Sequence, residues 1–376
     1  MPKVLYISPN GYLGGAERFV LNAAKAHKIK NEIKIGILFF SDGEACKEAQ
    51  KAGIDFFVLK HHFRMRQPFK FFLALREIRR VVIRFKPDVL HLTMPYSHIV
   101  LSLATFGLNL KKVWFQHGPV GGRLDRIANL FPVDMIWYNS HYLKAKHHLT
   151  WPSARVKVTE NVINLGVDAS RSSHCLFSEP IFYLGSAGRI CYGKGFHNII
   201  ISLGELKKEK KVMPFRLLIA GTSNSIADKE YHQNLIELAR SYNLNDEIEF
   251  LEHVKDMESF YHRLDILIHS PVMPEAFGLV VAEGMANGCL VIASDDGGVE
   301  DLLGNGAYGI SFSATGTNAV SELKTILEKI LISRDIDQLN RYRDMAEKGR
   351  LFVCTNYSMT SMITQIEKLY IELTKR

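Results

Sequence analysis

Residues 181–196 read IFYLGSAGRICYGKGF, and they predict a β-strand, a glycine-rich turn and the start of a helix. The run IFYLGS is apolar enough for a buried strand, and helical periodicity begins near Phe196. A strand that leads through a short turn into a helix is the repeating unit of a parallel sheet covered by helices on both faces. The stretch therefore predicts an α/β fold.

The turn within this stretch resembles the phosphate loop of an NTPase, whose pattern is G-x-x-x-x-G-K-[ST]. Gly188 and the pair Gly193-Lys194 fit the pattern. Gly195, however, stands where a hydroxyl would ligate magnesium. Arg189 and Lys194, together with exposed backbone amides, are instead suited to a diphosphate that needs no metal. Two surface cations on an ordinary strand-to-helix turn are the alternative interpretation.

The same alternation of strands and helices runs along the whole chain. A chain of 376 residues is too long for one hydrophobic core, and the polar stretch 168–180 separates two series of apolar runs. We therefore predict a domain over 1–170 and another over 178–356, each a doubly wound parallel sheet whose ligands bind at the carboxyl ends of its strands. Ligands also favour domain interfaces, so a central cleft is the expected active site. The expected strands are VLYI, IKIGILFF, FFVL, DVLHL, VWFQ, MIWY and VKVT, then IFYLGS, FRLLIAG, IEFLE, ILIHS and CLVIAS.

Composition limits the class of protein. With 47% hydrophobic and 23% charged residues the chain is globular, and its five scattered cysteines argue against a disulfide framework or a zinc site. Neither a signal peptide nor an apolar run of the ~20 residues that span a bilayer is evident, so we expect a cytoplasmic protein, with peripheral membrane contact as an alternative. The net charge of +8 favours an anionic partner. Nucleic acid is not expected, because no recognised binding motif is present.

A second motif, PEAFGLVVAEGMANG, contains Glu275 and Glu283. Eight helical residues rise about 12 Å, so these carboxylates are too far apart to act across one bond as a glycosidase pair. They suit the two ends of a long ligand such as a nucleotide-sugar. Glu275 would accept hydrogen bonds from sugar hydroxyls and Glu283 would take the ribose diol. The amides at the start of this helix, expected to face the phosphate, belong to Phe277, Gly278 and Leu279.

Taken together, the motifs resemble the retaining glycosyltransferases of family 4, which have the GT-B fold. The resemblance covers nearly the whole chain. It implies two Rossmann-like domains facing a central cleft, with the C-terminal helix 357–376 packing back on the first domain. The motifs, in family order, are GGAER, TENVINLGVD, AGRICYGKG, FRLLIAG, HSPVMPEAFGLVVAEGMANG, SDDGG and KLYIE.

The resemblance also assigns roles to single residues. Arg189 and Lys194 would neutralise the donor diphosphate as the leaving group, in a loop opened by Gly188. Glu275 would hold the donor sugar and Glu283 the ribose. His117, in VWFQHG, matches a family histidine that reaches the donor sugar, although a histidine there is otherwise often structural. The backbone at Gly14 and Gly15 would approach the donor phosphates and the acceptor.

Two segments depart from the family pattern. Glu160-Asn161-Val162 stands where proline, asparagine and glycine are common, and 220–223 lack a second glycine. Both departures bear on recognition of the nucleotide base rather than on the diphosphate and sugar.

The implied activity is a retaining, metal-independent transfer of a hexose from a nucleoside-diphosphate sugar, with no cofactor. The acceptor would be a saccharide or lipid-linked saccharide, as in the synthesis of cell-surface polysaccharide or glycolipid. A GT-B epimerase acting on a nucleotide-sugar and a non-catalytic nucleotide-sugar-binding protein are the alternatives.

Residues 60–86 carry nine lysines and arginines against one acid, Glu77. They predict a basic helix with an apolar stripe, which either rests on an anionic membrane or packs on the sheet with its arginines in solvent. The stripe consists of Phe71, Phe72, Leu75, Ile78 and Val82. The adjacent pairs His61-His62 and His147-His148 are not expected to bind metal, since sequence neighbours point in different directions.

Overall fold

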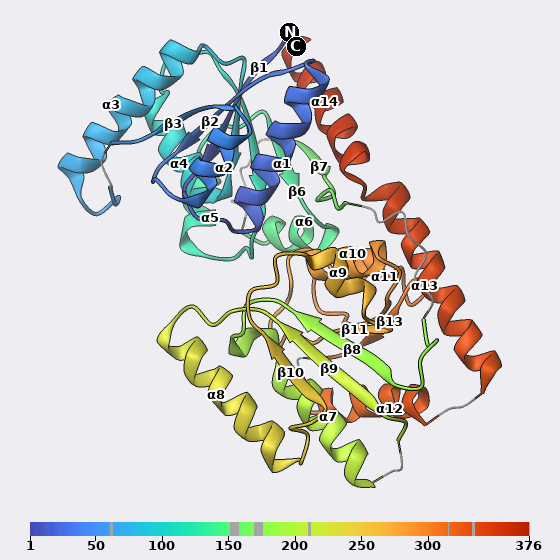
Figure 1. Ribbon diagram of the computed structural model, residues 1–376. Coiled ribbons are helices and arrows are strands. Elements are labelled where there is room, and N and C mark those ends of the chain that lie inside the picture. The colour runs from blue at the N-terminus through green and yellow to red at the C-terminus, as the bar shows by residue number, and fades with distance from the viewer. Residues whose placement is uncertain are drawn as a thin grey trace. The chain divides into compact units, whose positions relative to one another are not determined.

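The computed structural model describes residues 1–60, 63–150, 158–168, 176–209, 212–314, 316–332 and 335–375 (Figure 1). The chain forms two compact units. Unit 1 consists of Met1–Gly166 and Met359–Arg376, and unit 2 consists of Val167–Ser358. Most of the expected polar linker, residues 169–175, lies outside the described residues, as does the pair His61-His62.

A parallel sheet of seven strands forms the centre of unit 1, in the order β3-β2-β1-β4-β5-β6-β7. β1 pairs with β2 on one side and β4 on the other, so Val4 lies between Ile35 and Val89. Strand order reverses at β1, which makes it the switch point of a doubly wound sheet. The strands are β1 (Lys3–Ser8), β2 (Lys34–Phe39), β3 (Asp55–Val58), β4 (Val89–Thr93), β5 (Lys111–Gln116), β6 (Met135–Tyr138) and β7 (Thr159–Val162).

The helices of unit 1 bury their apolar faces on this sheet. In one hydrophobic cluster Leu5 of β1 and Leu90 of β4 meet Ile78 and Val82 of a long helix, α3. The helices are α1 (Gly15–Lys30), α2 (Glu44–Lys51), α3 (Pro68–Phe85), α4 (Met94–Ala104), α5 (Arg123–Ala128), α6 (His141–His148) and, from the C-terminal end of the chain, α14 (Met359–Lys375).

Buried polar contacts attach α14 to the rest of unit 1. Glu367 lies 3.0 Å from Nδ1 of His27 and accepts a 2.9 Å hydrogen bond from Lys30, both on α1. The hydroxyl of Tyr370 lies 2.6 Å from Nδ1 of His91 on β4. Because Glu367, His27, His91 and Tyr370 are buried, their contacts satisfy polar atoms that would be costly to bury alone.

The parallel sheet of unit 2 has the order β10-β9-β8-β11-β12-β13, with its switch point at β8. The strands are β8 (Phe182–Ala187), β9 (Phe215–Ala220), β10 (Ile248–Leu251), β11 (Ile266–His269), β12 (Leu290–Ser294) and β13 (Ile310–Phe312). The helices are α7 (Phe196–Glu209), α8 (Ile226–Ser241), α9 (Met257–His262), α10 (Leu279–Ala286), α11 (Glu300–Leu303), α12 (Ala319–Leu331) and α13 (Ile336–Asn356), and a 3₁₀ turn, η1, spans Tyr192–Lys194.

The predicted α/β fold with two parallel sheets is confirmed, but not every element was foreseen. Half of the expected strand VKVT, residues 156 and 157, lies outside the described residues, and β7, Thr159–Val162, shares Thr159 with that run. β13 has three residues, too few to show a period. α4 is buried on almost every side, so it lacks the polar face by which a helix is recognised in sequence.

A helix that spans a bilayer must be both long and apolar. No helix among the described residues meets both conditions.

Candidate active site

The glycine-rich turn follows β8, the switch-point strand of unit 2. The 3₁₀ turn Tyr192–Lys194 leads to Gly195, which has a φ of +63°. A Cβ at Gly195 would lie 1.9 Å from the carbonyl oxygen of Ser270, so only glycine fits there. The hydroxyl of Ser270 also donates a 2.9 Å hydrogen bond to the carbonyl of Gly195. The turn is therefore fixed against the segment that follows β11.

Lys194, Glu275 and His269 meet beyond the carboxyl ends of β8 and β11. Nζ of Lys194 donates a 2.5 Å hydrogen bond to Oε2 of Glu275. Nε2 of His269, the last residue of β11, lies 3.5 Å from the same oxygen. The side chains of Lys194 and Glu275 are 27% and 25% exposed, so a ligand can reach both of them. The structure thus brings together two residues that the sequence predicted separately.

The charges in this cluster follow from its burial. Burial alone would raise the pKa of the Glu275 carboxyl, but contact with His269 and the charge of Lys194 hold that pKa well below its usual range. Burial lowers the pKa of His269, and the nearby carboxylate of Glu275 only partly offsets this. At neutral pH the cluster therefore contains an ionised Glu275 and a neutral His269 beside Lys194.

The SDDGG segment holds the backbone of Glu275 in place. The amide of Glu275 donates to the carbonyl of Asp296 at 3.2 Å, and the amide of Gly298 donates to the carbonyl of Glu275 at 2.8 Å. Gly297 has a φ of +107°, and a Cβ on it would lie 2.2 Å from the carbonyl oxygen of Glu275. This close approach explains why the segment needs glycine.

Glu283 lies on α10, which starts only at Leu279 after Gly278. Glu275 precedes the helix, so the residues between Glu275 and Glu283 are not all helical. The predicted rise of about 12 Å over eight helical residues is therefore wrong. The hydroxyl of Tyr261 donates a 2.7 Å hydrogen bond to Oε2 of Glu283. Phe277 packs its buried ring on Tyr357, so its side chain is not available to a ligand. The expected contact of the Phe277, Gly278 and Leu279 amides with phosphate stays a prediction.

Arg189 lies in the turn between Gly188 and the buried Ile190, with its side chain exposed. Its positive charge is close enough to Asp228, in the first turn of α8, to interact with that carboxylate. Arg189 therefore marks the outer edge of the turn, while Lys194 occupies the inner side beside Glu275.

The remaining predicted residues belong to unit 1. His117 follows β5 directly, is 9% exposed and packs on Phe115 and Phe19. Burial lowers its pKa to about 3, so the imidazole is neutral at pH 7. Neither ring nitrogen has a hydrogen-bond partner among the described residues. His117 can therefore offer a ligand one donor and one acceptor, but no charge.

Gly14 caps the N-terminus of α1, and Gly15 is its first residue. A Cβ on Gly14 would lie 2.7 Å from Oε2 of Glu17, whereas a Cβ on Gly15 would meet no atom within 4 Å. The space beside Gly15 is open within unit 1.

A metal site in a protein is commonly held by three or more His, Cys, Asp or Glu side chains. In the part of the chain that the structure describes, no three His, Cys, Asp or Glu side chains are grouped as a metal site. His148 instead lies 3.0 Å from the carboxylate of Glu160, and His147 lies 2.8 Å from the hydroxyl of Tyr138.

Sequence reasoning missed His269 and Tyr261 as parts of the site. His269 lay inside the quoted HSP motif, and a histidine that ends a fully buried strand was a usable signal. Tyr261 had no such signal, because α9 has only six residues and its contact with Glu283 depends on packing.

Comparison with known proteins shows the family of the chain. A model described as Glycosyltransferase Family 4 matches residues 13–171, and one described as Glycosyl transferases group 1 matches 174–352. The chain belongs to glycosyltransferase family 4. Two relatives are a lipopolysaccharide 1,2-N-acetylglucosaminetransferase of Salmonella typhimurium and a D-inositol 3-phosphate glycosyltransferase of Corynebacterium urealyticum.

The first relative is 23% identical over 61% of this family 4 chain, and the second is 28% identical over 46% of it. The matched regions span 60% and 40% of the relatives' own lengths. A crystal structure of Anabaena HepE in complex with UDP and glucose superposes with a TM-score of 0.80 at 18% identity, covering 98% of this chain and 99% of that one. At that identity the likeness shows the GT-B fold.

Proposed function

We propose that this chain transfers a sugar, with retention of configuration, from a nucleoside-diphosphate sugar to a saccharide or lipid-linked saccharide acceptor, without metal or cofactor. The observation that carries the proposal is the cluster of Lys194, Glu275 and His269 beside the glycine turn. A partly exposed cation and an ionised carboxylate in contact match the two chemical parts of such a donor, its phosphates and its sugar hydroxyls.

Each residue then has a role. Lys194 and Arg189 neutralise the diphosphate as negative charge develops on the leaving oxygen, and one such contact is typically worth about 10² to 10³ in rate. Glu275, being ionised, accepts hydrogen bonds from sugar hydroxyls. His117, being neutral, hydrogen-bonds the donor sugar or the acceptor rather than stabilising a charge.

The configuration at the anomeric carbon is retained if the acceptor hydroxyl attacks from the same side that the phosphate leaves. The bond between the anomeric carbon and the phosphate oxygen breaks, and the bond to the acceptor oxygen forms. The acceptor proton passes to the departing phosphate, so no enzyme base is needed. In this scheme the protein supplies orientation and charge stabilisation.

The relatives guide the choice of substrates. The Salmonella protein is named for an action on lipopolysaccharide, and the Anabaena structure contains UDP and glucose. They support a uridine-linked hexose as the first donor to test, and cell-surface polysaccharide or glycolipid synthesis as the pathway.

Two measurements test the proposal. In a thermal-shift panel of nucleotide-sugars, the true donor at 100 times its Kd adds about 2.7 kcal/mol of stability. With that donor in radiolabelled form, we expect transfer of the label to a saccharide acceptor. The anomeric configuration of the product should equal that of the donor, and EDTA should not reduce the transfer rate. An altered nucleotide-sugar formed without acceptor would indicate an epimerase. Binding without turnover would leave only a nucleotide-sugar-binding protein.

A further inference from the structure

The basic helix α3 buries one apolar face and exposes further apolar side chains on its outer side. Ala74, Ile78, Val82 and Phe85 are buried against the sheet of unit 1, so part of the predicted stripe packs on the core. Phe72, predicted in the same stripe, is instead 56% exposed. In Figure 1 no other helix of unit 1 lies over the outer side of α3.

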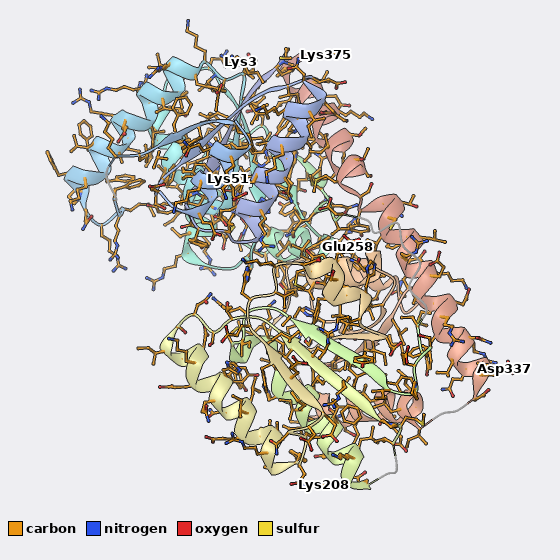
Figure 2. The ribbon with its side chains drawn as sticks, viewed as in Figure 1. Lys3, Lys51, Lys208, Glu258, Asp337 and Lys375 are labelled. Carbon is orange, nitrogen blue, oxygen red and sulfur yellow. The ribbon has the colours of Figure 1, made fainter. Side chains whose placement is uncertain are left out.

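The outer face of α3 alternates large apolar and cationic side chains. Phe69 is 74% exposed and Ile83 is 52% exposed. Steps of three and four residues place Phe69, Phe72, Arg76, Arg80 and Ile83 on one side of a helix. With Arg84 they form what we call the α3 surface. Side chains extend outward from this helix without an element over them (Figure 2).

The apolar character continues onto the loop after α4. The guanidinium of Arg79 donates to the carbonyl oxygens of Ala104 at 3.2 Å and Phe106 at 2.9 Å, which fixes this loop beside α3. The ring of Phe106 is 84% exposed, and Leu103 is also exposed. Leu103 and Phe106 thus add exposed apolar side chains beside α3.

A cavity of about 420 Å³ opens between β3 and α3 at the edge of the α3 surface. Its floor is apolar and its rim is cationic. Its one acid, Glu77, accepts a 3.0 Å hydrogen bond from the backbone amide of Lys60. Arg80 and Arg84 form no ion pair with any other described residue, so their charges are available to a ligand. The lining residues are Phe57, Lys60, Leu73, Glu77, Arg80, Val81 and Arg84.

We propose that the α3 surface docks unit 1 on a bilayer that contains anionic phospholipid, with one lipid phosphate in the cavity. Aromatic and aliphatic side chains enter the interface between headgroups and acyl chains, while arginines contact lipid phosphates. A second copy of this chain is a poor occupant, since a symmetric contact would bring the same cations together. The proposal is independent of the catalytic role of unit 2.

The test is retention by vesicles of phosphatidylcholine, with and without phosphatidylglycerol, using the full chain. We expect retention at low salt only when the anionic lipid is present. Arg76→Gln, Arg80→Gln and Arg84→Gln combined should weaken binding roughly 100-fold, at about a factor of five per cation. Phe69→Ser with Phe72→Ser should weaken it roughly tenfold or more.

A matched control removes the same number of charges from elsewhere in unit 1, by Lys47→Gln, Lys368→Gln and Lys375→Gln. All three lysines are exposed. The control should bind vesicles as the unmodified chain does, and circular dichroism checks that every variant is folded. The proposal is overturned if the unmodified chain is not retained by anionic vesicles. It is also overturned if the lysine control loses as much vesicle binding as the arginine variant. Vesicle binding that is unchanged by Phe69→Ser with Phe72→Ser would show a general polyanion-binding surface and overturn the proposal. Tight binding to duplex DNA without retention by vesicles would do the same.

Discussion

Lys194 and Glu275 share a hydrogen bond although 81 positions separate them in the chain. The contact matters in two ways, because the lysine helps to keep the carboxylate ionised and, in the proposed function, binds the donor phosphates. Each motif could be predicted from its own sequence, but the contact could not. It depends on β8 and β11 being neighbours in the sheet, a long-range fact that no local pattern contains.

Lys194→Met separates these two effects. We expect the transfer rate to fall about 10²- to 10³-fold, since one contact to the leaving group is lost. Burial then acts on Glu275 with less opposition, so its pKa rises. The acidic limb of the pH–rate profile should accordingly move to higher pH. A profile that keeps its acidic limb while the rate falls would contradict the coupling between the two residues.

Tyr261 illustrates a residue that acts through another. Its hydroxyl donates to Oε2 of Glu283, while its ring is buried in unit 2. Tyr261→Phe keeps the ring and removes one hydrogen bond that holds the carboxylate of Glu283. We expect the donor KM to rise roughly tenfold, with kcat nearly unchanged, because a hydrogen bond to a charged group is worth about 1.5 kcal/mol or more. Steady-state kinetics at varied donor concentration measure this split.

Tyr357→Phe is the matched control. Tyr357 is also buried in unit 2, and its hydroxyl lies 3.4 Å from the carbonyl of Asp301 rather than from a predicted ligand group. Donor KM should stay at the unmodified value in this variant. Equal kinetics in the Tyr261→Phe and Tyr357→Phe enzymes would remove Tyr261 from the positioning of Glu283.

At the scale of elements, the β8–α7 turn shows how tertiary contact decides which glycine is indispensable. Gly193 and Gly195 look alike in the motif. A Cβ on Gly193 would have only an ordinary 3.6 Å contact with Met273, whereas one on Gly195 would collide with the backbone of Ser270 at 1.9 Å. The sequence therefore predicted a glycine turn but could not rank its glycines.

Gly195→Ala should destabilise unit 2 by about 2 kcal/mol or more, since a left-handed alanine costs roughly 1 to 2 kcal/mol before the collision is counted. The measurement is the urea midpoint of unfolding. Gly193→Ala, in the same turn, is expected to change that midpoint little. Similar midpoints for the two variants would mean that the turn yields easily and that the contact with Ser270 does not hold it.

Other elements escaped prediction for related reasons. β13 is too short to show alternation, and α4 is too buried to show a polar face. The family resemblance placed the C-terminal helix on the first domain, but no local pattern gave the contacts of its Glu367 with His27 and Lys30, more than 330 positions away. In each case the missing information is a packing partner, which a strand or helix period does not specify.

At the scale of the molecule, buried neutral histidines tie stability to pH. Burial is the largest cause of a lowered pKa at each of them, in both units. The unfolded chain binds protons at these sites below about pH 6.5, and the folded chain binds them only at lower pH. The free energy of unfolding should therefore fall as the pH drops from about 6.5. The residues are His27, His91, His117 and His269.

His117 provides the quantitative case, since its pKa falls from 6.5 to about 3. At pH 5, which is 1.5 pH units below the pKa of the unfolded imidazole, the unfolded state binds a proton that the folded state does not. At 1.36 kcal/mol per unit, this lowers the free energy of unfolding of unit 1 by about 2 kcal/mol. His117→Gln removes the titrating group. Between pH 7 and pH 5 this variant should lose about 2 kcal/mol less stability than the unmodified chain, whatever its stability at pH 7.

Tryptophan fluorescence during urea unfolding makes this measurement specific to unit 1, because all three tryptophans of the sequence precede residue 167. His141→Gln, at an exposed position of the same unit, serves as the control and should keep the pH dependence of the unmodified chain. Should His117→Gln and His141→Gln show the same dependence, His117 must take up its proton in the folded state. It would then carry a charge at pH 5, and its role as a neutral hydrogen-bonding group would have to be abandoned.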